Sequence, residues 1–154
     1  MKTFSAVLAL LIFSAVVPAC SCVDMGMSIE ETVKGQLNSA SAVFEGKAIE
    51  YLDRKGTDRL YITFAVDRVW KGEVFPEFEL DTDMIRTQHG PVAMNSCEYP
   101  FEKGMTYVVF ARKTDKGWVT GDCSGTTQVK GKDWDQAVLK ALGPGKQKTD
   151  HKQK

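Results

Sequence analysis

Leu60-Tyr61-Ile62-Thr63-Phe64-Ala65-Val66 is the clearest strand signal in this chain of 154 residues. Successive side chains of a strand point to opposite faces, and here every second residue is strongly apolar. One face is therefore expected to lie in the core, and it carries Leu60, Ile62, Phe64 and Val66. The strand is expected to end at Trp70-Lys71-Gly72.

Further strand signals lie on both sides of this segment. They cover residues 42–51, a shorter half-exposed strand at 77–81, the continuous apolar run 106–112, and residues 118–123, which are expected to pair back across a turn at 115–117. A long loop is expected over residues 82–103. This pattern predicts about five short antiparallel strands.

Two helices are expected to flank the strands. Ser28 is a good N-cap and Glu31 completes a capping box, while Asp133 is expected to cap the second helix and Gly143-Pro144 to end it. The expected apolar faces are Ile29, Val33, Leu37 and Ala40 in the first helix, and Trp134, Ala137, Val138, Ala141 and Leu142 in the second. Strands with two flanking helices suit a small closed Greek-key barrel such as an OB-fold.

The first 19 residues read as a signal peptide that is removed. Lys2 supplies a positive start, an apolar run follows, and Val17-Pro18-Ala19 places small residues before a cleavage site. Cleavage before Cys20 leaves a domain at 20–143 and a basic tail at 144–154, which is expected to be disordered. In the competing interpretation, residues 17–20 form a bacterial lipobox and Cys20 carries lipid.

The mature chain has four cysteines, Cys20, Cys22, Cys97 and Cys123. An even set suits disulfides in an oxidising compartment, and lipidation of Cys20 would leave an odd thiol. Cys20 and Cys22 are too close in sequence to pair with each other without severe strain, so each is expected to pair with Cys97 or Cys123, in either of two connectivities. Both connectivities would fix the new terminus at its first and third residues. Its α-amino group and the Cys20 carbonyl oxygen would then form a compact chelator.

Other functions have little support in the sequence. The formal net charge of zero argues against a nucleic-acid partner. His89 and His151, the only histidines, have no neighbours at ligand spacing and are expected on the surface. Ser96-Cys97 and Ser124 belong to no nucleophile motif, so no enzyme activity and no cofactor are expected. The three tryptophans are expected to anchor the core or the barrel edge: Trp70, Trp118 and Trp134.

Several segments together resemble a known family. They are Cys20-Ser21-Cys22, residues 42–47, residues 64–72, Met94-Asn95-Ser96-Cys97-Glu98-Tyr99, residues 107–111 and residues 122–124. The mature chain to about Leu142 resembles the N-terminal, inhibitory domain of the tissue inhibitors of metalloproteinases, and more broadly a netrin-like module in single-domain form. It departs from that family in lacking the third disulfide and in having Glu98 where a glycine is usual.

The resemblance implies an OB-like barrel and the disulfides Cys20–Cys97 and Cys22–Cys123. It also implies that the Cys20 amine and carbonyl bind the catalytic zinc of a target metalloendopeptidase. The residues that would contact the protease, besides Cys20, are Ser21, Cys22, Val23, Met94, Asn95, Ser96, Cys97 and Glu98. The expected protein is a secreted monomer, periplasmic or lipid-anchored if bacterial, with no membrane contact unless Cys20 is lipidated. The alternatives are a netrin-like protein-binding module without inhibitory activity and a purely structural envelope protein.

Overall fold

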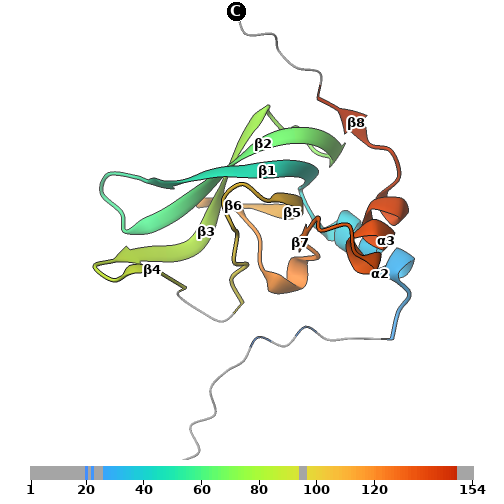
Figure 1. The fold of residues 1–154 in the computed structure, drawn as a ribbon, viewed down its shortest axis with the longest axis horizontal. Coiled ribbons are helices and arrows are strands. Elements are labelled where there is room, and N and C mark those ends of the chain that lie inside the picture. The colour runs from blue at the N-terminus through green and yellow to red at the C-terminus, as the bar shows by residue number, and fades with distance from the viewer. Residues whose placement is uncertain (1–19, 21, 23–25, 94–96, 149–154) are drawn as a thin grey trace, which may run out of the picture.

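The structure, a computed structural model, describes residues 20, 22, 26–93 and 97–148 (Figure 1). The helices are α2 (Ile29–Ser39) and α3 (Asp133–Leu142), with a 3-10 turn, η2, at Asp122–Ser124. The strands are β1 (Ala42–Asp53), β2 (Arg59–Lys71), β3 (Glu77–Thr87), β4 (Gly90–Ala93), β5 (Thr106–Thr114), β6 (Gly117–Val119), β7 (Thr127–Gln128) and β8 (Lys146–Gln147). The prediction of a mainly β chain with two helices is confirmed.

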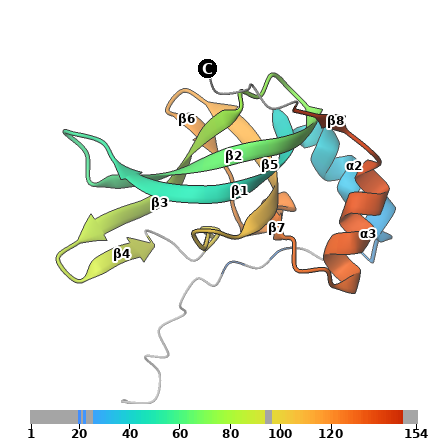
Figure 2. The same cartoon turned by 45° about the horizontal axis from the view of Figure 1, so that its top comes forward.

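Five of the strands form a closed ring. β1 pairs with β2, β2 with β3, β5 with β6 and β5 with β1, all antiparallel. The ring closes where β3 meets β6 in parallel, at Asp81 and Val119. The long strands β1 and β2 cross the molecule from the helices to the far end, where the β3–β4 hairpin extends outward (Figure 2).

The inside of the ring holds the main core. The four apolar residues predicted for one face of the central strand are buried, with Leu60, Ile62 and Phe64 at 0% exposure and Val66 at 7%. Phe64 packs edge-on against Phe44, with ring centroids 5.6 Å apart, and against Phe101 at 5.1 Å. The alternation of apolar residues therefore predicted both the strand and its buried face.

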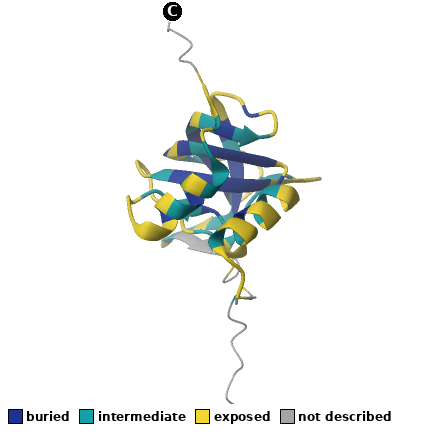
Figure 3. Ribbon diagram, turned by 90° about the vertical axis from the view of Figure 1, so that its right-hand side faces the viewer, coloured by how far each residue is buried: buried dark blue, intermediate teal, exposed yellow. Residues whose placement is uncertain are grey.

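A second apolar cluster lies between β5 and the two helices, which sit together at one end of the ring (Figures 1 and 3). Its buried members are Val33, Ala40, Val43, Val108, Phe110 and Val138. β5 is thus buried on both faces from Tyr107 to Ala111, as its continuous apolar run predicted. The capping box of α2 is also confirmed: Glu31 N donates to Ser28 Oγ (3.2 Å), and Ser28 N donates to the Glu31 carboxylate (3.0 Å).

The start of α3 differs from the prediction. Asp133 is the first helical residue and not the cap, while the buried Asp135 carboxylate accepts the backbone N–H groups of Lys130 (2.9 Å), Gly131 (2.8 Å) and Lys132 (2.9 Å). These bonds turn Asp135 and Val138 inward. Trp134, expected in the core, is consequently 52% exposed, and Ala137 lies outside the buried cluster.

Replacing Asp135 with alanine should destabilise the domain by about 2 kcal/mol, because three backbone N–H groups lose their charged, buried acceptor. Burial alone would raise the pKa of Asp135, but backbone hydrogen bonds from Gly131, Lys130, Lys132 and its own N–H outweigh it and lower that pKa below its usual value. The carboxylate's contribution is therefore complete above pH ~4, the unfolded value, and disappears as the pH falls through the lower folded pKa. Urea unfolding from pH 7 to pH 2 should show wild type and variant converging in acid. A constant difference across that range would contradict the assignment.

Two predicted irregular segments contain strands. Residues 82–103, expected to be a loop, include the second half of β3 and all of β4, because a bulge at Thr82-Asp83 interrupts the alternation without ending the strand. Residues 144–148, placed in the disordered tail, include β8, which pairs with Arg68 and Val69 on the part of β2 beyond β3. Residues 149–154 lie outside the described chain.

Candidate functional site

Two neighbouring disulfides fasten the segment at Cys20 and Cys22 to the ring. Cys20 is bonded to Cys97, with Cα atoms 5.0 Å apart, and Cys22 to Cys123, at 5.2 Å. This is the pairing that the family resemblance implied. The Cys20 and Cys123 sulfurs, which belong to different disulfides, are 4.0 Å apart. The two bonds therefore form one cluster that joins segments 77 and 101 residues apart in sequence.

The segments that carry Cys97 and Cys123 also contact each other through the backbone. Asp122 N donates to the Cys97 carbonyl oxygen at 2.9 Å. A Cβ atom on Gly121 would lie 2.9 Å from that same oxygen, so glycine permits the close approach. The Cys97 loop and η2 consequently hold their relative position through a hydrogen bond as well as through the two disulfides.

A network of hydroxyl groups attaches residues 120–126 to β5. Thr120 Oγ1 donates to the Phe110 carbonyl oxygen (2.8 Å), and Phe110 N donates to Thr126 Oγ1 (3.0 Å). Ser124 Oγ lies 2.7 Å from Thr120 Oγ1. Sequence reasoning named Ser124 only as outside any nucleophile motif and missed Thr120 and Thr126, although the Thr and Ser content of 120–126 was the available signal. The network fixes the segment on which Cys123 is carried.

An aromatic cluster anchors the chain just after Cys97. The Tyr99 ring lies 4.9 Å from Phe101 and 5.9 Å from Tyr107, and Tyr51 donates its hydroxyl to the Phe101 carbonyl oxygen at 2.8 Å. Burial, with a smaller contribution from Tyr107, raises the pKa of Tyr51 and of Tyr99 to about 12. The raised pKa values reflect how deeply both phenols are packed, and the Tyr51 hydrogen bond and the Tyr99 ring contacts attach the chain after Cys97 to the core.

A pocket of about 410 Å³ opens directly beside the disulfide cluster. Its lining includes Cys20, Cys97 and Cys123, residues near the end of α2, and the exposed Arg112 of β5. Cys20 is half-buried, whereas the other three cysteines are exposed. The disulfide cluster is thus reachable from solvent.

The structure describes only part of the expected contact surface. It brings Cys20, Cys22 and Cys97 together, with the half-buried Glu98 following in the chain. The other expected contact residues lie outside the described chain: Ser21, Val23, Met94, Asn95 and Ser96.

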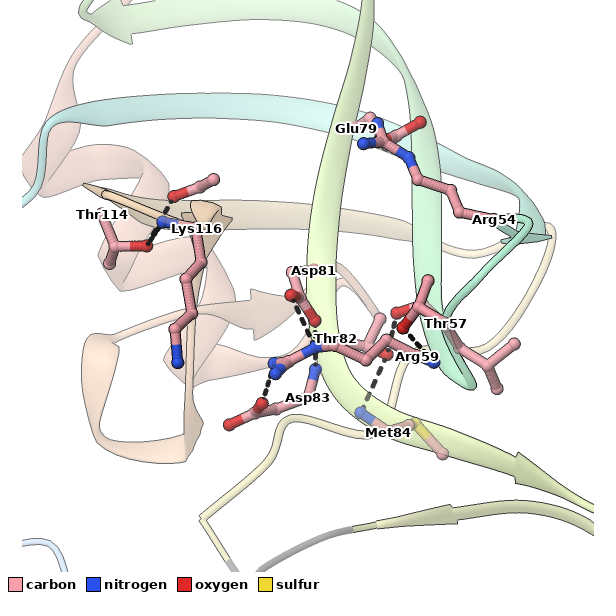
Figure 4. Close-up of polar contacts among 12 residues, drawn as sticks. Arg54, Thr57, Arg59, Glu79, Asp81, Thr82, Asp83, Met84, Thr114 and Lys116 are labelled. Atoms are coloured by element: carbon pink, nitrogen blue, oxygen red, sulfur yellow. Dashed lines mark hydrogen bonds and ion pairs between the residues drawn. The ribbon is translucent and has the colours of Figure 1, made fainter.

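A polar clamp, missed by sequence reasoning, lies at the bulge of β3, where β3 pairs with the start of β2 (Figure 4). Arg59 Nε contacts the Asp81 carboxylate at 3.0 Å, and the same guanidinium pairs with Asp83. Asp81 also accepts Asp83 N at 2.9 Å, and Asp83 has φ 57°, a left-handed conformation. Thr82 Oγ1 donates to the Leu60 carbonyl oxygen at 2.7 Å. The Asp81-Thr82-Asp83 triplet is visible in the sequence, but its arginine partner lies 22 residues before Asp81 and is revealed only by the pairing of β2 with β3.

The predictions for the tryptophans and histidines are confirmed in part. Trp118 packs on Phe78, with ring centroids 5.1 Å apart, and Trp70 Nε1 donates to the Gly143 carbonyl oxygen at 2.9 Å, so two of the three tryptophans are anchors as predicted. His89 is exposed, as expected. His151 lies outside the described residues.

Within residues 20, 22, 26–93 and 97–148, no group of three or more His, Cys, Asp or Glu side chains is arranged to hold a metal ion. In the same part of the chain, every helix is too short or too polar to cross a membrane. No protein-family model matches the chain, and a search of curated proteins also found no match.

Proposed function

We propose that this protein is a secreted, single-domain inhibitor of zinc metalloendopeptidases, with the mature N-terminus at Cys20 as its metal-binding group. The observation that carries the proposal is the disulfide cluster, which fixes residues 20 and 22 to two distant segments of the ring. Chain termini usually fray. Cleavage before Cys20 would create a terminus that is instead attached through its own side chain.

The chemistry of such a terminus suits a catalytic zinc. A metalloprotease zinc has three protein ligands and one open position that is occupied by water. The α-amino nitrogen and the carbonyl oxygen of Cys20 would displace that water and close a five-membered chelate ring. An α-amino group titrates near pH ~8, so losing its proton costs little near neutrality.

Preorganisation supports tight binding at this position. Immobilising a flexible segment on association opposes binding, and a segment already fixed avoids most of that cost. Here the disulfides, the hydrogen bond from Asp122 N to the Cys97 oxygen and the close approach at Gly121 restrict the segment before any partner arrives. Ser21 and Val23, with the loop from Met94 to Glu98, would form the protein-contacting ridge around the chelate.

The proposed fold is an OB-like Greek-key barrel of the netrin-like type. Its support is the closed ring of five strands, filled by Phe44, Phe64 and Phe78, with α2 and α3 at one end. In this arrangement the barrel is a rigid support for the cysteine cluster.

The direct test uses protein secreted with its own leader. Mass spectrometry should find a mature chain that begins with an unmodified Cys20, and this material should inhibit members of a panel of zinc endopeptidases at one-to-one stoichiometry. A mature Cys20 that is lipidated or acylated would overturn the proposal and favour a tethered netrin-like binding module. So would a free Cys20 terminus that inhibits no member of the panel.

A further inference from the structure

The two disulfides lie close enough to exchange partners. Cys123 Sγ is 4.0 Å from Cys20 Sγ, in van der Waals contact across two separate bonds. The sequence left two pairings open, and they differ only in which of Cys97 and Cys123 holds Cys20. In the pairing that the structure does not show, Cys123 would hold Cys20. The observed contact already places Cys123 Sγ beside the Cys20–Cys97 bond.

We propose that the cluster is a thiol-triggered switch, in which Cys20 passes locally from Cys97 to Cys123. The trigger is a small-molecule thiol such as glutathione. Thiol–disulfide exchange proceeds by attack of a thiolate on a disulfide sulfur, and access to that sulfur limits the rate. Cys22 is an exposed residue and lines a surface pocket, which gives an incoming thiolate a route to its side of the disulfide.

Each step conserves atoms and electrons. The external thiolate bonds to Cys22 Sγ, the Cys22–Cys123 bond breaks, and Cys123 leaves as a thiolate. That thiolate bonds to Cys20 Sγ, the Cys20–Cys97 bond breaks, and Cys97 leaves as a thiolate. Attack of Cys97 on the mixed disulfide at Cys22 then forms Cys22–Cys97 and releases the external thiolate. The net change is an isomerisation with no change in oxidation state.

The surrounding structure favours exchange without unfolding. The hydrogen bond from Asp122 N to the Cys97 oxygen and the close approach of Gly121 to the same oxygen are backbone contacts that involve no sulfur atom, so opening a disulfide does not itself break them. The hydroxyl network around Thr120 and Thr126 keeps the Cys123 segment on β5. The sulfurs therefore stay adjacent, which gives the intramolecular step a high effective concentration.

The consequence rests on the proposed function. Transfer of Cys20 to Cys123 moves the mature terminus off the loop that carries Cys97 and Glu98. The chelating atoms then no longer sit beside the proposed ridge, so the exchanged form should be a weak inhibitor. A thiol would thereby switch inhibition off while the domain stays folded.

The test is the Cys22→Ser variant, which leaves Cys123 as a thiol without any reductant. Alkylation with N-ethylmaleimide followed by peptide mapping should find a Cys20–Cys123 linkage and a labelled Cys97. In the matched control, Cys22→Ser/Cys123→Ser, the Cys20–Cys97 linkage should persist and Cys97 should stay unlabelled, because no other cysteine is left to displace it. Exclusive labelling of Cys123 in the single variant, with Cys20–Cys97 intact, would overturn the switch.

Wild-type mature protein gives the same answer if the single variant does not fold. Limiting glutathione, acid quenching and mapping should yield the Cys20–Cys123 linkage, whereas recovery of the native linkages alone would reject the proposal. Linkage mapping does not depend on inhibition. Exchange without inhibition by either form would therefore reject the proposed function alone, and inhibition without exchange would reject the switch alone.

Discussion

Mature protein extended by one alanine before Cys20 should inhibit its target zinc endopeptidase about 1,000-fold less strongly, a loss of roughly 4 kcal/mol in binding free energy. The extension converts the Cys20 amine into an amide, which is a poor zinc ligand and has no room at the metal. Two chelating atoms become one, and the fixed terminus cannot shift to compensate because both disulfides hold it. The inhibition constant, measured by progress curves against the most sensitive protease of the panel, checks this.

The matched control carries the same alanine after Lys154, at the other end of the chain. It should inhibit like the wild type, and both proteins should show the same thermal unfolding midpoint and the same disulfide map. Acetylation of the Cys20 amine should reproduce the loss without adding a residue. Equal inhibition by the extended and unextended proteins would show that zinc chelation by the terminus is not the mechanism.

Local signals in the sequence predicted the parts of the fold that depend on local chemistry. The apolar alternation from Leu60 to Val66 identified a strand and its buried face, and the Ser28–Glu31 pair identified the start of a helix. Asp135 was missed because Asp133 was expected as the cap, whereas the three donors to Asp135 lie in the turn at residues 130–132. β8 was missed because, within the described part of the chain, it pairs with the far end of β2, which no property of residues 146–147 reveals.

The candidate site was also predicted only in part, and the missing part depends on the fold. Cysteine number and position predicted a clamped segment, but spacing alone left the partners open, since disulfide pairing depends on where the ring places Cys97 and Cys123. The 4.0 Å contact between the disulfides is a property of that placement alone. The Thr82-Asp83 bulge was hidden for a related reason: it depends on Arg59, which lies on a neighbouring strand.

Replacing Arg59 with methionine should lower the free energy of unfolding by about 3 kcal/mol, because it leaves a buried carboxylate without its charge partner. The Asp81 side chain is only 1% exposed and the Arg59 side chain 27%. The same substitution frees Asp83, whose left-handed backbone is sustained by its bond to Asp81 and its pairing with Arg59 (Figure 4). Chemical denaturation at pH 7 measures the loss, and hydrogen exchange should rise first in β4 and the end of β3.

Arg86→Met is the control, because it removes an arginine from the same hairpin but breaks only an exposed pair, Arg86–Asp53, whose side chains are 47% and 56% exposed. It should cost less than about 1 kcal/mol. Adding Asp81→Asn to Arg59→Met should recover part of the stability, since the amide oxygen still accepts Asp83 N and no unpaired charge remains buried. If Arg59→Met costs no more than Arg86→Met, the clamp is not a stabilising element. If the double variant is no more stable than Arg59→Met, the loss arises from packing of the arginine stem and not from the stranded charge of Asp81.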